Sequence, residues 1–113
     1  MKKIEAIIKT EKFTAVKDSL AKAGFTSLTT YEVKGRGKQS GVEVIDMLGS
    51  KIRLDLLPKT KVEIVVEDKD VAKVTDLIID AAATSAIGSG KIFVSPVENA
   101  IRIRTRESGK DAI

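Results

Sequence analysis

The sequence contains no cysteine and no histidine. A disulfide is therefore impossible within the chain, and so are the zinc sites that depend on cysteine and histidine ligands. Catalytic devices in which a histidine activates a serine or a cysteine are excluded for the same reason. Serine, threonine, lysine and the carboxylates remain as candidate nucleophiles, so we expect a protein whose primary role is not that of an enzyme.

Aromatic residues and long apolar runs are also scarce. Aromatics make up 4% of the chain, which leaves few rings for stacking on nucleic-acid bases. No stretch approaches the roughly 20 apolar residues of a membrane-spanning helix, and the charges of Lys2, Lys3 and Glu5 come too early for a signal peptide. The 20 basic residues are interleaved with 16 acidic ones. We therefore predict a cytoplasmic protein without membrane insertion and without a nucleic-acid partner.

A length of 113 residues predicts one domain, residues 1–113, and the spacing of its apolar residues predicts both strands and helices. Strands have apolar residues at every second position, and helices have them three or four residues apart. Thr10 is the expected N-cap of the first helix, Gly24 its end, and Asp68 the N-cap of the second. The expected strands are residues 3–9, 28–33, 59–66, 91–97 and 100–105, and the expected helices are residues 11–23 and the segment after Asp68.

This order of elements predicts a ferredoxin-like βαββαβ fold of the α+β class, with both helices on one face of an antiparallel sheet. Charged side chains dominate the other face, yet Ile7 and Val65 also lie there. An apolar pair on a polar face indicates a ligand or a partner. A subunit interface is an equally good explanation, and the two are compatible.

The connection at residues 36–57, which we call the arm, is far longer than a hairpin requires. Residues 51–56 alternate, so one interpretation is a β-ribbon that extends the neighbouring strands. The arm also carries more apolar side chains than a solvated loop needs: Val42, Val44, Ile45, Met47 and Leu48. We therefore expect an apolar-tipped arm that grips another protein.

Glycines and cations come together in the last third of the chain. Gly88-Ser89-Gly90-Lys91 could wrap an anion, and a strand at residues 101–104 would place the Arg102 and Arg104 guanidiniums on one face, roughly 7 Å apart. Two guanidinium groups at this spacing suit a polyphosphate. The P-loop is excluded because Ser85 and Ile92 occupy its required positions. An ordinary turn followed by a solvated strand face is the alternative interpretation.

Taken together, these residues resemble the P-II nitrogen-regulatory signal-transduction family over essentially the whole chain. Four segments carry the resemblance. They are Met1-Lys2-Lys3-Ile4-Glu5-Ala6-Ile7-Ile8-Lys9; Glu32-Val33-Lys34-Gly35 with Gly37-Lys38-Gln39 and Gly41; Leu57-Pro58-Lys59 with Lys61-Val62-Glu63-Ile64-Val65-Val66; and Gly90-Lys91-Ile92-Phe93-Val94 with Ile101-Arg102-Ile103-Arg104-Thr105.

The resemblance implies a homotrimer that binds ATP or ADP in clefts between subunits. Ile7, Thr29 and Val65 would border the adenine, and Glu63 would lie near it or in the interface. Residues of the glycine loop at 84–91, the B-loop of the family, would hold the phosphates together with cations. The full implied nucleotide set also contains Gly35, Gly37, Lys38, Gln39, Thr84, Gly88, Ser89, Gly90, Lys91, Arg102 and Arg104.

The resemblance further implies that the protein senses 2-oxoglutarate when Mg-ATP is bound. Gln39, Gly41, Lys59 and Gly88 would bind the keto acid, and the Gln39 amide oxygen would hold Mg²⁺ together with the phosphates. The arm corresponds to the T-loop, which would control a target such as an ammonium transporter, glutamine synthetase or a nitrogenase-related protein.

The sequence also departs from the family pattern. The usual loop Thr-Gly-x-Ile-Gly-Asp-Gly-Lys here reads Thr84-Ser85-Ala86-Ile87-Gly88-Ser89-Gly90-Lys91, so a carboxylate is missing beside the phosphates. A divergent regulator that binds adenine nucleotides without sensing 2-oxoglutarate is therefore the main alternative. An RNA-binding ferredoxin-like domain would need aromatics on the sheet face. An enzyme of the trimeric ferredoxin-like kind is a further alternative.

Overall fold

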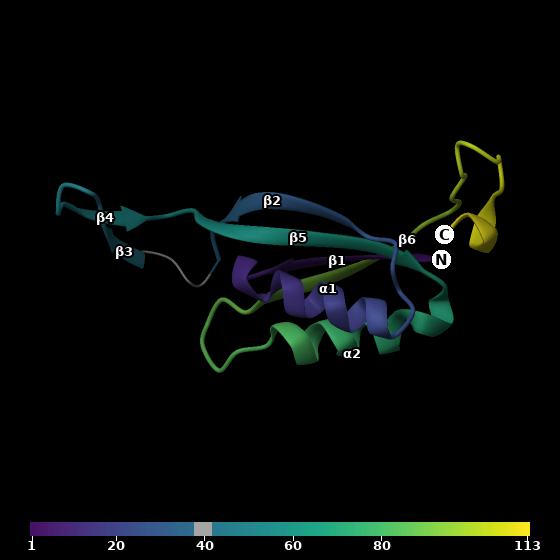
Figure 1. Ribbon diagram of the computed structural model, residues 1–113, viewed down its shortest axis with the longest axis horizontal. Coiled ribbons are helices and arrows are strands. Elements are labelled where there is room, and N and C mark those ends of the chain that lie inside the picture. Colours follow the sequence, from purple (N-terminus) through teal and green to yellow (C-terminus); the bar gives the residue numbers. More distant parts are fainter. Residues whose placement is uncertain (38–41) are drawn as a thin grey trace.

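The computed structural model describes residues 1–37 and 42–113, without the side chains of residues 42–44 and 52–54. Its main sheet is antiparallel, with strand order β2-β5-β1-β6. Two helices lie side by side on one face of this sheet (Figure 1). The bounds are β1 (Lys2–Ile8), α1 (Phe13–Lys22), β2 (Thr29–Gly35), β5 (Leu57–Val66), α2 (Val71–Ala82) and β6 (Gly90–Pro96). The predicted ferredoxin-like α+β fold is confirmed.

The core lies between the two helices and the sheet. Each central strand turns every second side chain toward the helices, as the alternation predicts. The helices contribute residues at three- and four-residue spacing from the faces that meet the sheet. The buried apolar set is Ile4, Ala6 and Ile8 from β1; Val62, Ile64 and Val66 from β5; Val16 and Leu20 from α1; and Val74, Ile78 and Ala82 from α2.

Both helices begin differently from the prediction. Each is preceded by a 3-10 turn, Thr10–Lys12 before α1 and Asp68–Asp70 before α2, and neither helix has a side-chain cap. The Thr10 hydroxyl instead accepts a hydrogen bond from the buried Thr60, 3.2 Å away. The predicted capping roles are therefore wrong, because tertiary contacts take both side chains. Gly24 ends the first helix as predicted, with φ +94°.

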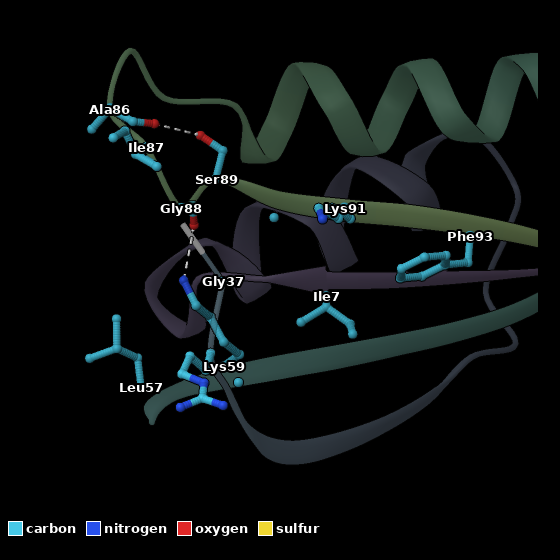
Figure 2. Close-up of a pocket in the computed structure, with 13 residues that line it drawn as sticks. Ile7, Gly37, Leu57, Lys59, Ala86, Ile87, Gly88, Ser89, Lys91 and Phe93 are labelled. Atoms are coloured by element: carbon cyan, nitrogen blue, oxygen red, sulfur yellow. Dashed lines mark hydrogen bonds between the residues drawn. The ribbon is translucent and has the colours of Figure 1, made fainter. Parts of the chain in front are cut away.

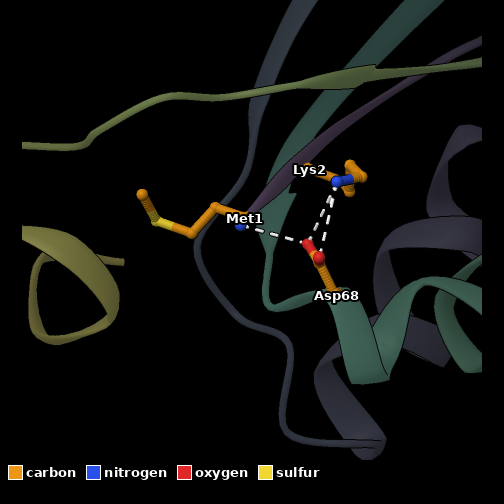
Figure 3. A network of polar contacts seen from close by, with 3 residues as sticks. All are labelled: Met1, Lys2 and Asp68. Carbon is orange, nitrogen blue, oxygen red and sulfur yellow. Dashed lines mark hydrogen bonds and ion pairs between the residues drawn. The ribbon is translucent and has the colours of Figure 1, made fainter.

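The Asp68 carboxylate forms ion pairs with the first two residues of the chain. The Met1 amino group lies 3.1 Å from its Oδ1, and Lys2 Nζ lies 3.3 Å from the same oxygen (Figure 3). Hydrogen bonds from these two cations lower the pKa of Asp68, the amino group having the larger effect. This contact fastens the first strand to the turn that begins α2.

The arm contains a second, two-stranded sheet. β3 (Val42–Ile45) pairs with β4 (Lys51–Leu54) in antiparallel register, from Val42 opposite Leu54 to Ile45 opposite Lys51. The ribbon interpretation therefore holds for these segments. Figure 1 shows the hairpin projecting from one end of the main sheet, whereas both chain ends lie at the other end. The longest dimension of the molecule is 55 Å along this direction.

The predicted strand at residues 100–105 is wrong. This segment turns back on itself: Ile101 bridges to Ser108, and the Arg102 amide donates to the Glu107 carbonyl over 2.8 Å. The Asn99 side chain accepts from the amides of Ala100 and Gly109 and so closes the loop. A local turn satisfies the backbone groups that a sheet would otherwise pair. A 3-10 helix, Gly109–Ala112, follows.

Among the residues that the structure describes, none of the helices has the length and apolar character required to cross a membrane.

Candidate functional site

A cleft of about 510 Å³ opens where the arm leaves the main sheet. Strands β1, β5 and β6, the start of the arm and the loop before β6 all contribute to it (Figure 2). Eight of the predicted ligand-binding residues line this cleft. They are Ile7, Gly35, Gly37, Lys59, Gly88, Ser89, Gly90 and Lys91. Residues from four separate segments of the chain thus meet at one place.

The cleft is electropositive. Its described lining includes three cations, Arg36, Lys59 and Lys91, and no carboxylate. Ile7 and Phe93 supply apolar surface on the neighbouring strands β1 and β6. Unlike charges in a partly enclosed site attract more strongly than in open water. The arrangement suits a ligand with an anionic part and a flat or apolar part.

Lys59 is a cation of the cleft whose pKa is lowered. Its ammonium donates to the Gly88 carbonyl over 2.9 Å, from β5 to the glycine loop (Figure 2). Burial lowers the pKa of Lys59, the nearby Lys9 lowers it further, and Glu11 partly opposes both effects. A bound carboxylate or phosphate would favour the charged form of this side chain.

The backbone of the glycine loop requires left-handed conformations. Gly88 has φ +94° and Gly90 has φ +117°. A Cβ on Gly90 would lie only 1.8 Å from the Ile7 carbonyl oxygen, where no side chain fits. Gly90 also pairs with Ile8 in the sheet. The close approach of β6 to β1 therefore demands this glycine, whatever ligand the loop binds.

Ser89 stabilises the loop from within. Its hydroxyl lies 2.7 Å from the Thr84 hydroxyl and accepts from the Thr84 amide over 3.0 Å. Both hydroxyls also lie 3.3 Å from the Ala86 carbonyl. Thr84 does not line the cleft but contacts it through Ser89. The neutral Ser89 hydroxyl thus stands at the position where the family pattern has an aspartate carboxylate.

The other predicted adenine-binding residues do not line this cleft. Thr29 and Glu63 face each other on β2 and β5, and Val65 lies opposite Lys3. Because Ile7 lies four residues along β1 from Lys3, Val65 is separated from Ile7 by roughly 13 Å along the sheet. Val65 instead borders a smaller hollow of about 230 Å³ that includes Lys110 and Ile113 near the C-terminus.

Arg102 and Arg104 also lie outside the cleft of their own chain. They belong to the C-terminal turn, at the end of the sheet opposite the arm (Figure 1). The Arg102 guanidinium forms an ion pair with Glu107, 3.2 Å away, and both side chains are partly exposed. The structure therefore separates the predicted residues that line the cleft from a second group, Val65, Arg102 and Arg104, at the opposite end of the sheet.

The predictions for Lys38, Gln39 and Gly41 lie outside the described residues. Within the described ranges 1–37 and 42–113, no cluster of three or more metal-ligating side chains occurs.

Sequence reasoning missed five residues that line the cleft: Arg36, Leu57, Ala86, Ile87 and Phe93. All five lie close in sequence to predicted residues. Arg36 lies between two predicted glycines, and Ala86 and Ile87 precede Gly88 in the loop at residues 84–91. Leu57 and Phe93 each lie two positions from a predicted lysine in the same strand, so each shares a sheet face with that lysine.

Comparison with known proteins gives a consistent assignment. The sequence profile described as nitrogen regulatory protein P-II matches residues 1–107. A nitrogen regulatory protein P-II 2 from Methanothermobacter thermautotrophicus is 51% identical over 113 residues, covering all of this chain and 97% of the relative. Proteins named nitrogen regulatory protein P-II from Cereibacter sphaeroides and Microchaete diplosiphon are each 50% identical over the full length of both chains. This chain belongs to the nitrogen regulatory protein P-II family.

Proposed function

We propose that this protein is a non-enzymatic cytoplasmic sensor that binds ATP or ADP and signals nitrogen status through its arm. The observation that carries the proposal is the cleft, in which Arg36, Lys59 and Lys91 surround a glycine loop beside apolar Ile7 and Phe93. Phosphates match the cations, and an adenine ring matches the apolar strand residues.

The separation of the two residue groups supports nucleotide binding between subunits. A head-to-tail ring brings one end of a subunit against the opposite end of the next. In a closed trimer of this kind, the cleft around Ile7 and Lys91 would meet Val65, Arg102 and Arg104 of a neighbouring copy. Each nucleotide would then be enclosed by two chains, and the two residue groups would together form one site.

We further propose that 2-oxoglutarate binds when Mg-ATP is present. Lys59 supports this step, because its ammonium already points at Gly88 and would gain a stronger partner in a carboxylate. Gln39 and Gly41 would complete the keto-acid site and Gln39 would hold Mg²⁺. The target would be an ammonium transporter, glutamine synthetase or a nitrogenase-related protein, reached by the arm. The alternative is a divergent regulator that binds nucleotide alone.

Titration calorimetry with ATP and with ADP tests the nucleotide site. Lys91→Ala and Arg102→Ala each remove a charge-assisted contact worth about 1.5–3 kcal/mol, so we expect affinity to fall at least tenfold. Lys17→Ala, on the exposed side of α1, is the matched control and should bind like the wild type. Unchanged binding in the first two variants would place the nucleotide elsewhere.

The keto-acid site is tested by the same method in three solutions: 2-oxoglutarate alone, with ATP, and with Mg-ATP. We expect heat of binding only with Mg-ATP, and none in Lys59→Ala although that variant still binds ATP. A wild-type protein that binds Mg-ATP but shows no 2-oxoglutarate response would favour the divergent regulator.

A further inference from the structure

Arg36 connects the cleft with the arm. It follows the last residue of β2 and lines the cleft, yet its Nη1 atom lies 2.9 Å from Oδ2 of Asp55. Asp55 stands between β4 and β5, on the returning side of the arm. The last backbone pair of the main sheet joins Gly35 to Leu57. The Arg36–Asp55 ion pair is therefore a link across the base of the arm, just beyond the sheet.

This ion pair is weak because both side chains are exposed to solvent. The two side chains are 62% and 64% exposed, so water and salt screen their attraction. A nucleotide polyphosphate carries several negative charges, and a guanidinium binds phosphate oxygens with two parallel hydrogen bonds. The cleft walls would also exclude part of the water that screens a bound phosphate. A polyphosphate in the cleft would therefore outcompete the single carboxylate for Arg36.

We propose that Arg36 is a phosphate-binding residue that Asp55 withholds from the empty cleft, so that nucleotide binding opens the base of the arm. The inference rests on the proposed function, in which the cleft binds a nucleotide. Free energy coupling makes the effect reciprocal. A partner protein that keeps the Arg36–Asp55 pair closed would weaken nucleotide binding, and a partner that separates the pair would strengthen it.

A double-mutant cycle read by ATP calorimetry tests the competition. Arg36→Gln should weaken ATP binding by about fivefold, because a partly exposed charge-assisted contact is lost. Asp55→Asn should strengthen binding by about two- to threefold, because the competitor is gone. In the Arg36→Gln background, Asp55→Asn should have no further effect, since Asp55 acts through Arg36. Asp18→Asn removes the same charge from an exposed position of α1 and controls for net charge.

Hydrogen exchange of the arm gives a second, structural readout. In the wild type, ATP should accelerate amide exchange in residues 42–57 because the base of the arm opens. In Asp55→Asn, exchange should already be fast without ATP and should change little on its addition. This readout separates a switch from a merely structural ion pair, which would loosen the arm without changing its response to ATP.

The outcomes distinguish the two proposals. A wild-type protein that binds no ATP contradicts the proposed function and this inference with it. The inference alone is contradicted if the wild type binds ATP and Asp55→Asn changes ATP affinity equally with Arg36 and with Gln at position 36. Asp55 would then act only through long-range electrostatic repulsion of the nucleotide. ATP binding without any change in arm exchange also overturns it.

Discussion

Gly90 shows how one residue can satisfy two demands at once. The glycine loop predicts an anion-binding role, whereas the structure gives a separate steric reason for the same residue. With φ +117° and the Ile7 carbonyl oxygen 1.8 Å from a virtual Cβ, the position excludes every other residue type. Mutation of Gly90 therefore changes the fold before it changes any ligand contact.

We predict that Gly90→Ala destabilises the protein by at least about 3 kcal/mol, because backbone strain and a steric clash add. Gly24→Ala is the matched control: Gly24 also has a positive φ, +94°, but a Cβ there meets nothing within 4 Å. It should cost only about 1–2 kcal/mol. Urea denaturation followed by circular dichroism measures both. Equal losses would show that β6 can shift to accommodate the methyl group.

A second residue-scale prediction concerns Lys59 and pH. Burial and Lys9 lower the pKa of Lys59, so this lysine loses its proton at a lower pH than an ordinary lysine. Only the charged form attracts an anion, so affinity for 2-oxoglutarate with Mg-ATP should fall as the pH rises through this pKa.

Calorimetry at increasing pH, up to the ordinary lysine pKa of about 10.4, measures this decline. Lys59→Arg keeps its charge over the whole range and should remove the decline. A decline of the same size in Lys59→Arg would assign the titration to another group.

At the scale of elements, the arm combines an ordered turn with an exposed apolar tip. The Asp46 carboxylate accepts hydrogen bonds from the amides of Leu48 and Ser50, over 2.9 and 2.7 Å. The tip side chains are mostly exposed: Ile45 is 71% exposed, Met47 102% and Leu48 91%. Bare apolar side chains on a preformed turn are typical of a surface that inserts into another protein.

We predict that Asp46→Ala loosens this turn without unfolding the domain. Loss of two charge-assisted hydrogen bonds at an exposed site should raise amide exchange at Leu48 and Ser50 by about five- to tenfold. Global stability should be unchanged, because the arm hairpin has its own sheet. Asp18→Ala, at an exposed position of α1, should leave these two amides unaffected. Unaltered exchange in Asp46→Ala would mean that Gly49 and the β3–β4 ladder hold the turn alone.

At the scale of the whole molecule, the sheet has two unlike faces. The two helices α1 and α2 cover one face and leave the other uncovered in the part of the chain that the structure describes (Figure 1). Aromatic side chains of β2 and β6 lie on the uncovered face. Tyr31 is 45% exposed and Phe93 51%. Contact with other copies of the chain would cover this surface.

We therefore predict a homotrimer. Light scattering at micromolar concentration should give about three times the 12.2 kDa chain mass. ATP should raise the melting temperature of the assembly, because a ligand that bridges subunits stabilises them together. A monomer mass would remove the intersubunit site that the two separated residue groups require.

The sequence by itself determined the order and faces of the elements that have a local period. β1, β5 and the two helices follow their apolar spacing, because each side chain's direction depends only on the regular backbone of its own element. The same sequence named most residues of the cleft through its glycines and its resemblance to the P-II family. Their convergence at the arm end of the sheet came from strand register, which pairs Ile7 with both Lys61 and Lys91.

Only the tertiary structure decided the features that depend on distant partners. Alternation at residues 101–104 predicts a strand, but a strand needs a neighbouring edge, and this segment bonds to its own turn instead. Thr10 has the chemistry of a cap, yet its hydroxyl meets Thr60, which lies 50 residues away. Arg36 likewise lies between the cleft and Asp55 because the two sides of the arm meet at its base. The sequence states which side chain stands at each position, whereas the tertiary fold determines which residue that side chain contacts.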